Sequence, residues 1–154
     1  MNEKFLVLDR NIQNDLASIE KLYEALGIPD LSGTAPPKEV IFIAYHLHGI
    51  YTAFENIFRN ISAVFENHLE ASEWHRQLLQ RMQLDLTPLR PAVIDIEMYE
   101  KLKDMLGFRH VFRAAYGVAL NPVRLQDVLR AALELKTLYR PQMERFLGFL
   151  RGLE

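Results

Sequence analysis

The sequence predicts an all-α protein, an antiparallel up-and-down four-helix bundle with an additional short helix. Apolar residues recur every three or four positions along most of the 154 residues, which is the spacing of one helix face. No segment alternates apolar and polar residues with a period of two, and no short apolar run is bounded by turns. The connections are short, which favours antiparallel neighbours. We therefore expect one domain that covers residues 1–154.

The first two helices are expected over residues 2–26 and 38–69, where apolar side chains form continuous stripes. Gly27 ends the first helix, and the prolines and glycine of residues 28–37 are typical of a loop. The phenylalanine-rich stripe of the second helix is typical of a protein core. Gly49 lies inside it at a cost of about 1 kcal/mol relative to alanine, so we expect a neighbouring helix to approach closely there.

Three further helices complete the expected bundle. A short one is expected over residues 72–84 and begins with a serine that can cap it. Asp95 can cap the next helix, which should run into residues 108–117. The last helix starts with an asparagine and a proline at 121–122, a cap residue followed by proline at the first helical position. Pro141 is expected to kink it.

The composition excludes several classes of function. A net charge of -2 excludes a uniformly basic surface, although a local basic patch is compatible with it. Without cysteine the chain has no disulfide, thiolate zinc site or cysteine nucleophile. No apolar run reaches the ~18 residues of a membrane span, and the N-terminus lacks a signal-peptide pattern. We expect a cytoplasmic protein that does not contact the membrane.

Metal, cofactor and serine-nucleophile motifs are absent from the sequence. His46 and His48 are two residues apart on a helix, so they point about 200° apart and cannot share a metal. The other histidines lack zinc-type spacing, and no Glu-x-x-His pattern completes a di-iron site. The sequence also lacks a Walker loop, a dinucleotide-binding glycine motif and a G-x-S-x-G turn. We therefore expect no metal site and no cofactor.

The chemically richest stretch reads Phe-Arg-His-Val-Phe-Arg-Ala-Ala-Tyr-Gly. Helical spacing places Arg109, Arg113 and Tyr116 on one face. His110 and Ala114 lie about a quarter-turn away. Arginine offers phosphate a planar fork of donors, and histidine transfers protons near neutral pH. The stretch therefore indicates a phosphate-handling site, the alternative being a solvated helix face with a few arginines.

A second candidate for nucleic-acid binding lies in the short third helix. Trp74, followed by His75 and Arg76, can form a platform that stacks a base and binds a phosphate. In the alternative interpretation the tryptophan covers the core, and its polar neighbours face water.

The stretch around Arg109 resembles the HEPN family, and specifically the HepT-like ribonuclease toxins. These all-α proteins carry an R-x4-6-H motif, often extended to R-x4-H-x-Y. Arg109 matches the arginine, His110 the polar position after it and Tyr116 the tyrosine. Further segments resemble parts of a HepT-like subgroup in the same order, namely residues 47–51 with Glu55, 74–79 and 90–93. The resemblance extends over about residues 40–125 and implies a single HEPN domain.

One position departs from the family pattern. The family histidine should lie five residues after Arg109, where this sequence has Ala114. A methyl group neither accepts nor donates a proton, so the chain lacks its main general acid/base and is expected to be inactive. The alanine is either an engineered replacement of a histidine or a natural loss.

The resemblance implies metal-independent cleavage of RNA, in which the 2′-hydroxyl attacks the adjacent phosphate. Arg109 would bind the phosphate and position 114 would transfer protons, with Arg113 and His110 as weaker phosphate contacts. On an unbroken helix, positions 109 and 114 lie about 140° apart. Either the backbone breaks near the motif, or two copies face each other across a two-fold axis. The family is usually dimeric, so a homodimer is expected.

The resemblance also implies a protein partner, a minimal nucleotidyltransferase antitoxin. Tyr116 matches the tyrosine that such an antitoxin modifies with AMP, which would add negative charge beside Arg109 and repel an RNA phosphate. Otherwise Tyr116 is an aromatic residue packed at the dimer seam. A function of a different class is a catalytically silent helical dimer that binds the nucleotidyltransferase, and a third alternative is a metal-dependent bundle enzyme.

Overall fold

The structure is a computed structural model, and it describes residues 2–29, 31, 35–66, 74–114 and 121–153. For residue 74 and residues 109–114 it describes the helical backbone but not the side chains. Within these ranges the chain forms five helices and no extended strand. They are α1 (Glu3–Leu26), α2 (Pro37–Phe65), α3 (Trp74–Met82), α4 (Ile96–Ala114) and α5 (Pro122–Arg151).

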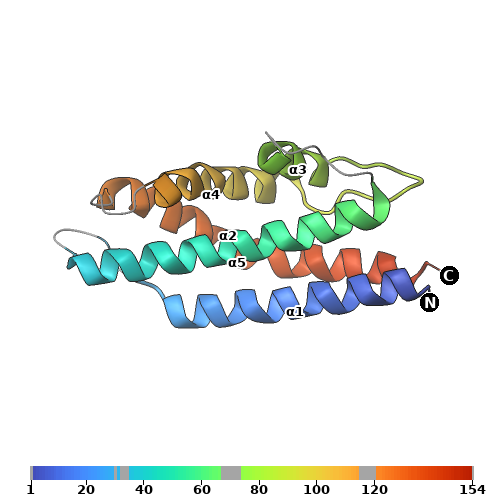
Figure 1. Cartoon of the computed structure of the whole chain (residues 1–154), viewed down its shortest axis with the longest axis horizontal. Helices are drawn as coiled ribbons and strands as arrows, with labels where there is room; N and C mark the ends of the chain where they lie inside the picture. The colour runs from blue at the N-terminus through green and yellow to red at the C-terminus, as the bar shows by residue number, and fades with distance from the viewer. Residues whose placement is uncertain (1, 30, 32–34, 67–73, 115–120, 154) are drawn as a thin grey trace.

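The four long helices form an up-and-down bundle, and α3 lies at one end of it (Figure 1). α1 packs mainly on α2, and α4 mainly on α5. α1 begins, and α5 ends, at the same end of the bundle, which is also where α3 lies (Figure 1). The predicted fold class is therefore confirmed. None of the described helices is both long and apolar enough to cross a lipid bilayer.

Aromatic contacts tie α1, α2 and α5 together in the core. The rings of Tyr23 and Tyr139 stack at 5.9 Å, and Phe54 meets Tyr139 edge-on at 5.3 Å. The Tyr23 hydroxyl donates to the carbonyl of Ala132 at 2.7 Å, so its burial leaves no polar group unsatisfied. Burial raises the pKa of Tyr23 far above its ordinary value, with Tyr139 as a second cause.

Gly49 marks a close approach of two helices, as expected. A Cβ at this position would lie 3.2 Å from Cδ1 of Leu22, a side chain of α1. The missing side chain therefore allows α1 and α2 to pack closely, which offsets the conformational cost of a glycine inside a helix.

The helix ends follow the expected signals in most places. Asp95 accepts a hydrogen bond from the amide of Met98 at 2.8 Å and caps α4. The Asn121 side chain accepts from the amide of Val123 at 3.0 Å and caps α5. α5 continues through Pro141 as one helix.

The expected end of α2 is wrong. The helix stops at Phe65, and Glu66 is its C-terminal cap residue with extended backbone angles (φ -135°, ψ 157°). In the sequence the apolar spacing continues to Leu69, four residues after Phe65, so the periodicity alone set the expected limit too far along the chain. The serine expected to cap α3 lies outside the described residues.

Candidate functional site

The predicted phosphate-handling stretch forms the last turns of α4. Arg109, His110, Arg113 and Ala114 all belong to this helix, while Tyr116 lies outside the described residues. Their side chains are not described, so the structure places these positions by backbone alone.

α4 is unbroken between the two central positions of the motif. It runs from Ile96 to Ala114 and passes Gly107 without interruption. At 100° per residue, positions 109 and 114 then lie about 140° apart around the helix axis. A break in the backbone is therefore ruled out as the way to bring them together.

The two predicted nucleic-acid contacts lie at different ends of α4. α3 lies at the end of the bundle where α4 begins (Figure 1). The amides of Val93 and Ile94, just before α4, donate to the carbonyl of Met82 at the end of α3 at 2.8 and 3.2 Å. Arg109 comes thirteen residues after Ile96, about 20 Å further along the helix at 1.5 Å per residue. A single phosphate cannot contact both regions of one chain.

His75 is bound to a buried carboxylate. Its Nδ1 lies 2.7 Å from Oε2 of Glu55, a residue in the middle of α2. The Glu55 side chain is 2% exposed and the His75 side chain 30% exposed. A carboxylate accepts from an N–H group, so this contact places a proton on Nδ1 and fixes the orientation of the ring.

Arg59 also reaches Glu55. Its Nη2 lies 3.9 Å from Oε1, one helical turn along α2, and its side chain is 56% exposed. Arg76 follows His75 on α3 and is exposed. Together Glu55, Arg59 and His75 define the Glu55 cluster. Trp74 begins α3, but its side chain is not described.

Sequence reasoning gave neither Glu55 nor Arg59 a role in this cluster. Two signals were present. Glu55 lies four residues after Tyr51 and three before Phe58, so it borders the apolar stripe of its helix. Arg59 follows it with i,i+4 spacing, which is typical of a helical ion pair.

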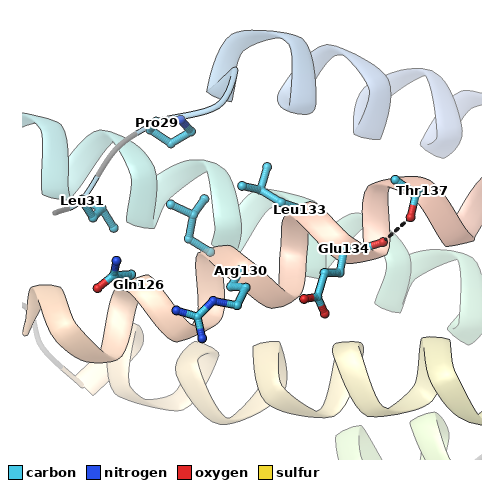
Figure 2. Close-up of a pocket in the computed structure, with 8 residues that line it drawn as sticks. Pro29, Leu31, Gln126, Arg130, Leu133, Glu134 and Thr137 are labelled. Carbon is cyan, nitrogen blue, oxygen red and sulfur yellow. Dashed lines mark hydrogen bonds between the residues drawn. The ribbon is translucent and has the colours of Figure 1, made fainter.

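An open groove lies elsewhere, between the segment after α1 and the outer face of α5 (Figure 2). Its apolar lining comes mainly from Leu31, Leu129 and Leu133. Around them lie polar side chains, of which Glu134 pairs with Lys101 on α4 at 2.5 Å. No histidine lines this groove, so it offers no proton-transfer group that works near neutral pH.

Across the part of the chain that the structure describes, no three histidine, cysteine, aspartate or glutamate side chains are grouped so that they could hold a metal ion.

The described helices form an up-and-down bundle, and its fourth helix, α4, ends in a stretch that contains arginine and histidine. This combination defines a small all-α protein with a candidate phosphate site. A family model described as HepT-like protein matches residues 42–150, most of the chain. The matched region reaches from the start of α2 almost to the end of α5 and includes both Arg109 and Ala114. The chain belongs to the HepT-like family. Comparisons with curated proteins and with solved structures find no match.

Proposed function

We propose that this chain is a HEPN-type toxin built to cleave RNA without a metal, and that Ala114 leaves it inactive. The observation that carries the proposal is the family match over residues 42–150, because this region contains the whole stretch from Arg109 to Tyr116. Arg109, His110 and Arg113 all belong to the last turns of α4, which supports a phosphate-handling role.

In the proposed reaction the 2′-hydroxyl loses its proton and its oxygen attacks the neighbouring phosphorus. The bond from phosphorus to the 5′-oxygen breaks, and that oxygen takes up a proton. Arg109 stabilises the negative charge that builds on the phosphate oxygens. A histidine at position 114 would transfer the protons. Arg113 and His110 supply weaker phosphate contacts.

The proposed active form is a homodimer. Positions 109 and 114 lie about 140° apart on α4, so one copy serves a single phosphate poorly. A two-fold axis near the end of α4 would let Arg109 from one copy work with position 114 of the other.

The proposed regulator is a minimal nucleotidyltransferase antitoxin that modifies Tyr116 with AMP. The added phosphate would place negative charge near Arg109 and repel the phosphate of RNA. Comparing the mass of the protein with and without such a partner and ATP tests this part of the proposal.

Restoring histidine at position 114 tests the reaction. Ala114→His is expected to cleave RNA, to keep its activity in a chelator and to slow growth when expressed. Adding Arg109→Ala should abolish the cleavage. Ala17→His is the matched control, because it adds the same side chain at an exposed alanine of α1, outside the motif, and should remain inactive. If Ala114→His cuts no RNA, the ribonuclease proposal is wrong.

The alternative is a catalytically silent helical dimer that binds a nucleotidyltransferase. The alanine at position 114 is the observation that favours it. In that case Ala114→His would stay harmless and inactive, while the dimer and its complex with the partner would still form.

A further inference from the structure

We infer that Arg124, in the first turn of α5, binds the same RNA phosphate as Arg109. The inference rests on the proposed function, because it takes an RNA phosphate as the ligand. It extends that function by adding a second helix to the site. The family motif lies on α4 and the residues that follow it, so Arg124 is outside the motif.

The first step is the register between α4 and α5, which run antiparallel (Figure 1). Two contacts define this register. The amide of Asp95, just before α4, donates to Oε1 of Gln142 at 2.7 Å. Six residues later along the chain, Lys101 pairs with Glu134 at 2.5 Å. Each turn towards the end of α4 is therefore matched by a turn towards the start of α5.

This register brings Arg124 beside the last turns of α4. It is level with Phe112, which comes three residues after Arg109. At 1.5 Å per residue, positions 109 and 124 are then about 5 Å apart along the bundle axis. The axes of packed helices lie about 8–10 Å apart, so one phosphate between the two helices is within reach of both arginines.

The second step is the face of each helix on which the two positions lie. Arg124 comes eighteen residues before Gln142, which is about five complete turns of an α-helix. It therefore shares the face of α5 that contacts the start of α4. Position 109 comes eleven residues after Met98 and lies about 20° from it around the axis of α4. Met98 is fully buried, so position 109 lies on the inward side of α4.

The third step is the charge of Arg124, which no described carboxylate neutralises. The first turn of α5 contains no acidic residue. The next acid along the helix, Asp127, pairs with Arg130 at 3.8 Å. Arg124 is exposed and forms no ion pair with any residue that the structure describes. Its planar fork of N–H donors is therefore open to the oxygens of a phosphate.

Two arginines from neighbouring helices can divide the work on one phosphate. Arg109 and Arg124 would donate to different oxygens, and together they would stabilise the negative charge that builds on them. Both arginines come from the same chain, so a second copy is needed only for the proton transfer at position 114.

Binding of RNA to the unmodified chain is the primary test, because the alanine at position 114 is expected to leave the RNA intact. A fluorescent single-stranded oligoribonucleotide is the probe, with anisotropy as the readout. Arg124→Ala is expected to weaken binding about tenfold, the size of one charge-assisted contact. The slope of log K against log salt concentration should become shallower by about 0.7, the value for one phosphate contact on a single strand. Arg124→Lys keeps the charge, so it should keep the slope and recover part of the affinity.

Arg145→Ala is the matched control. Arg145 is also an exposed arginine of α5, but it lies about 30 Å further along the helix. Its removal should leave RNA binding as it is in the unmodified chain. Thermal unfolding followed by circular dichroism should show that Arg124→Ala folds normally, because no described residue pairs with Arg124. A loss of binding then reports a lost ligand contact rather than lost structure.

A double-mutant cycle with Arg109→Ala tests whether the two arginines share a phosphate. If they do, the loss of affinity in the double variant should be smaller than the product of the two single losses, because each change already weakens the hold on that phosphate. Losses that simply multiply would place Arg124 on a different phosphate and overturn the shared site.

Activity separates this inference from the proposed function. Adding Arg124→Ala to Ala114→His should lower kcat/KM about tenfold. If Ala114→His cleaves RNA and the added change alters neither kcat nor KM, the inference fails while the proposed function stands. It also fails if Arg124→Ala keeps the affinity and salt slope of the unmodified chain, or if Arg145→Ala weakens binding equally. If neither the unmodified chain nor Ala114→His binds RNA, the proposed function fails together with the inference.

Discussion

The guanidinium of Arg90 donates two hydrogen bonds to one carboxylate oxygen of Glu66, from Nε at 3.3 Å and from Nη2 at 3.1 Å. The Arg90 side chain is fully buried and that of Glu66 is 2% exposed. Arg81 donates to the other oxygen at 2.8 Å. Arg90 also donates to the carbonyls of Arg81, Leu84 and Pro91. These bonds fix the segment between α3 and α4 against the end of α2, and so they hold α3 in place.

Removing Arg90 should strongly destabilise the bundle. Arg90→Ala leaves the Glu66 carboxylate buried without its main partner, and breaking a buried pair in this way costs about 3–5 kcal/mol. Urea unfolding followed by circular dichroism measures the loss. Arg81→Ala is the matched control. The Arg81 side chain is 37% exposed, so its removal should lower the free energy of unfolding much less. Equal losses for the two variants would contradict this assignment.

The pair between Asp9 and Arg151 should make stability depend on pH. Arg151 Nε lies 2.7 Å from Oδ2 of Asp9 and joins the end of α5 to the start of α1. This hydrogen bond is the main cause that lowers the pKa of Asp9 below its ordinary value of 3.8. A carboxyl group with a lowered pKa stabilises the fold above its unfolded pKa and loses that contribution as the pH falls through its folded pKa.

Arg151→Met tests this dependence. The free energy of unfolding should be lower for the variant than for the unmodified chain at neutral pH. The difference should shrink once the pH falls below 3.8, as Asp9 becomes protonated. Arg145→Met, at an exposed arginine on the same helix, should show no such convergence.

Asp15 should contribute a pH dependence of stability with the opposite sign to that of Asp9. Burial raises the pKa of its carboxyl group, against the hydrogen bond that Asn56 donates to Oδ2 at 2.9 Å. The ionised form therefore costs stability at neutral pH, and this cost disappears as the pH falls through the raised pKa. Asp15→Asn keeps an acceptor oxygen and should raise the free energy of unfolding at pH 7, but not at pH values where Asp15 is protonated. A loss of stability at pH 7 would disprove this explanation.

The two glycines inside α2 and α4 should respond differently to alanine. Nothing lies within 4 Å of a Cβ added at Gly107. Gly107→Ala should therefore raise the free energy of unfolding by about 0.5–1 kcal/mol, because alanine favours the helix more than glycine does. A Cβ at Gly49 would lie 3.2 Å from Leu22, whose side chain must shift to accept it. Gly49→Ala should therefore raise the free energy of unfolding by less than Gly107→Ala does. Thermal unfolding of both variants measures the difference, and equal gains would show that the contact with Leu22 is not restrictive.

The helices of this protein were largely predictable from local sequence. The apolar spacing predicted all five, and the cap residues Asp95 and Asn121 marked two starts that the hydrogen bonds confirm. Gly49 predicted a close helix approach. These features depend on residues a few positions apart, so the sequence contains the information directly.

Partners that come from different helices were not predictable in this way. Glu55 and His75 are 20 positions apart, and Asp9 and Arg151 are 142 apart. Whether such groups meet depends on how each helix is rotated and shifted against its neighbours. That arrangement is set by the packing of the whole core rather than by any local pattern.

The sequence by itself determined the helical class, the order of the helices and the position of the arginine-containing stretch near the end of the fourth. Only the tertiary structure decided that α4 runs unbroken through this stretch, that Glu55 is buried against His75, and that α3 lies at the other end of α4 from Arg109. The physical reason is that apolar periodicity fixes which face of a helix is buried, whereas the partner of each buried polar group is fixed by three-dimensional packing.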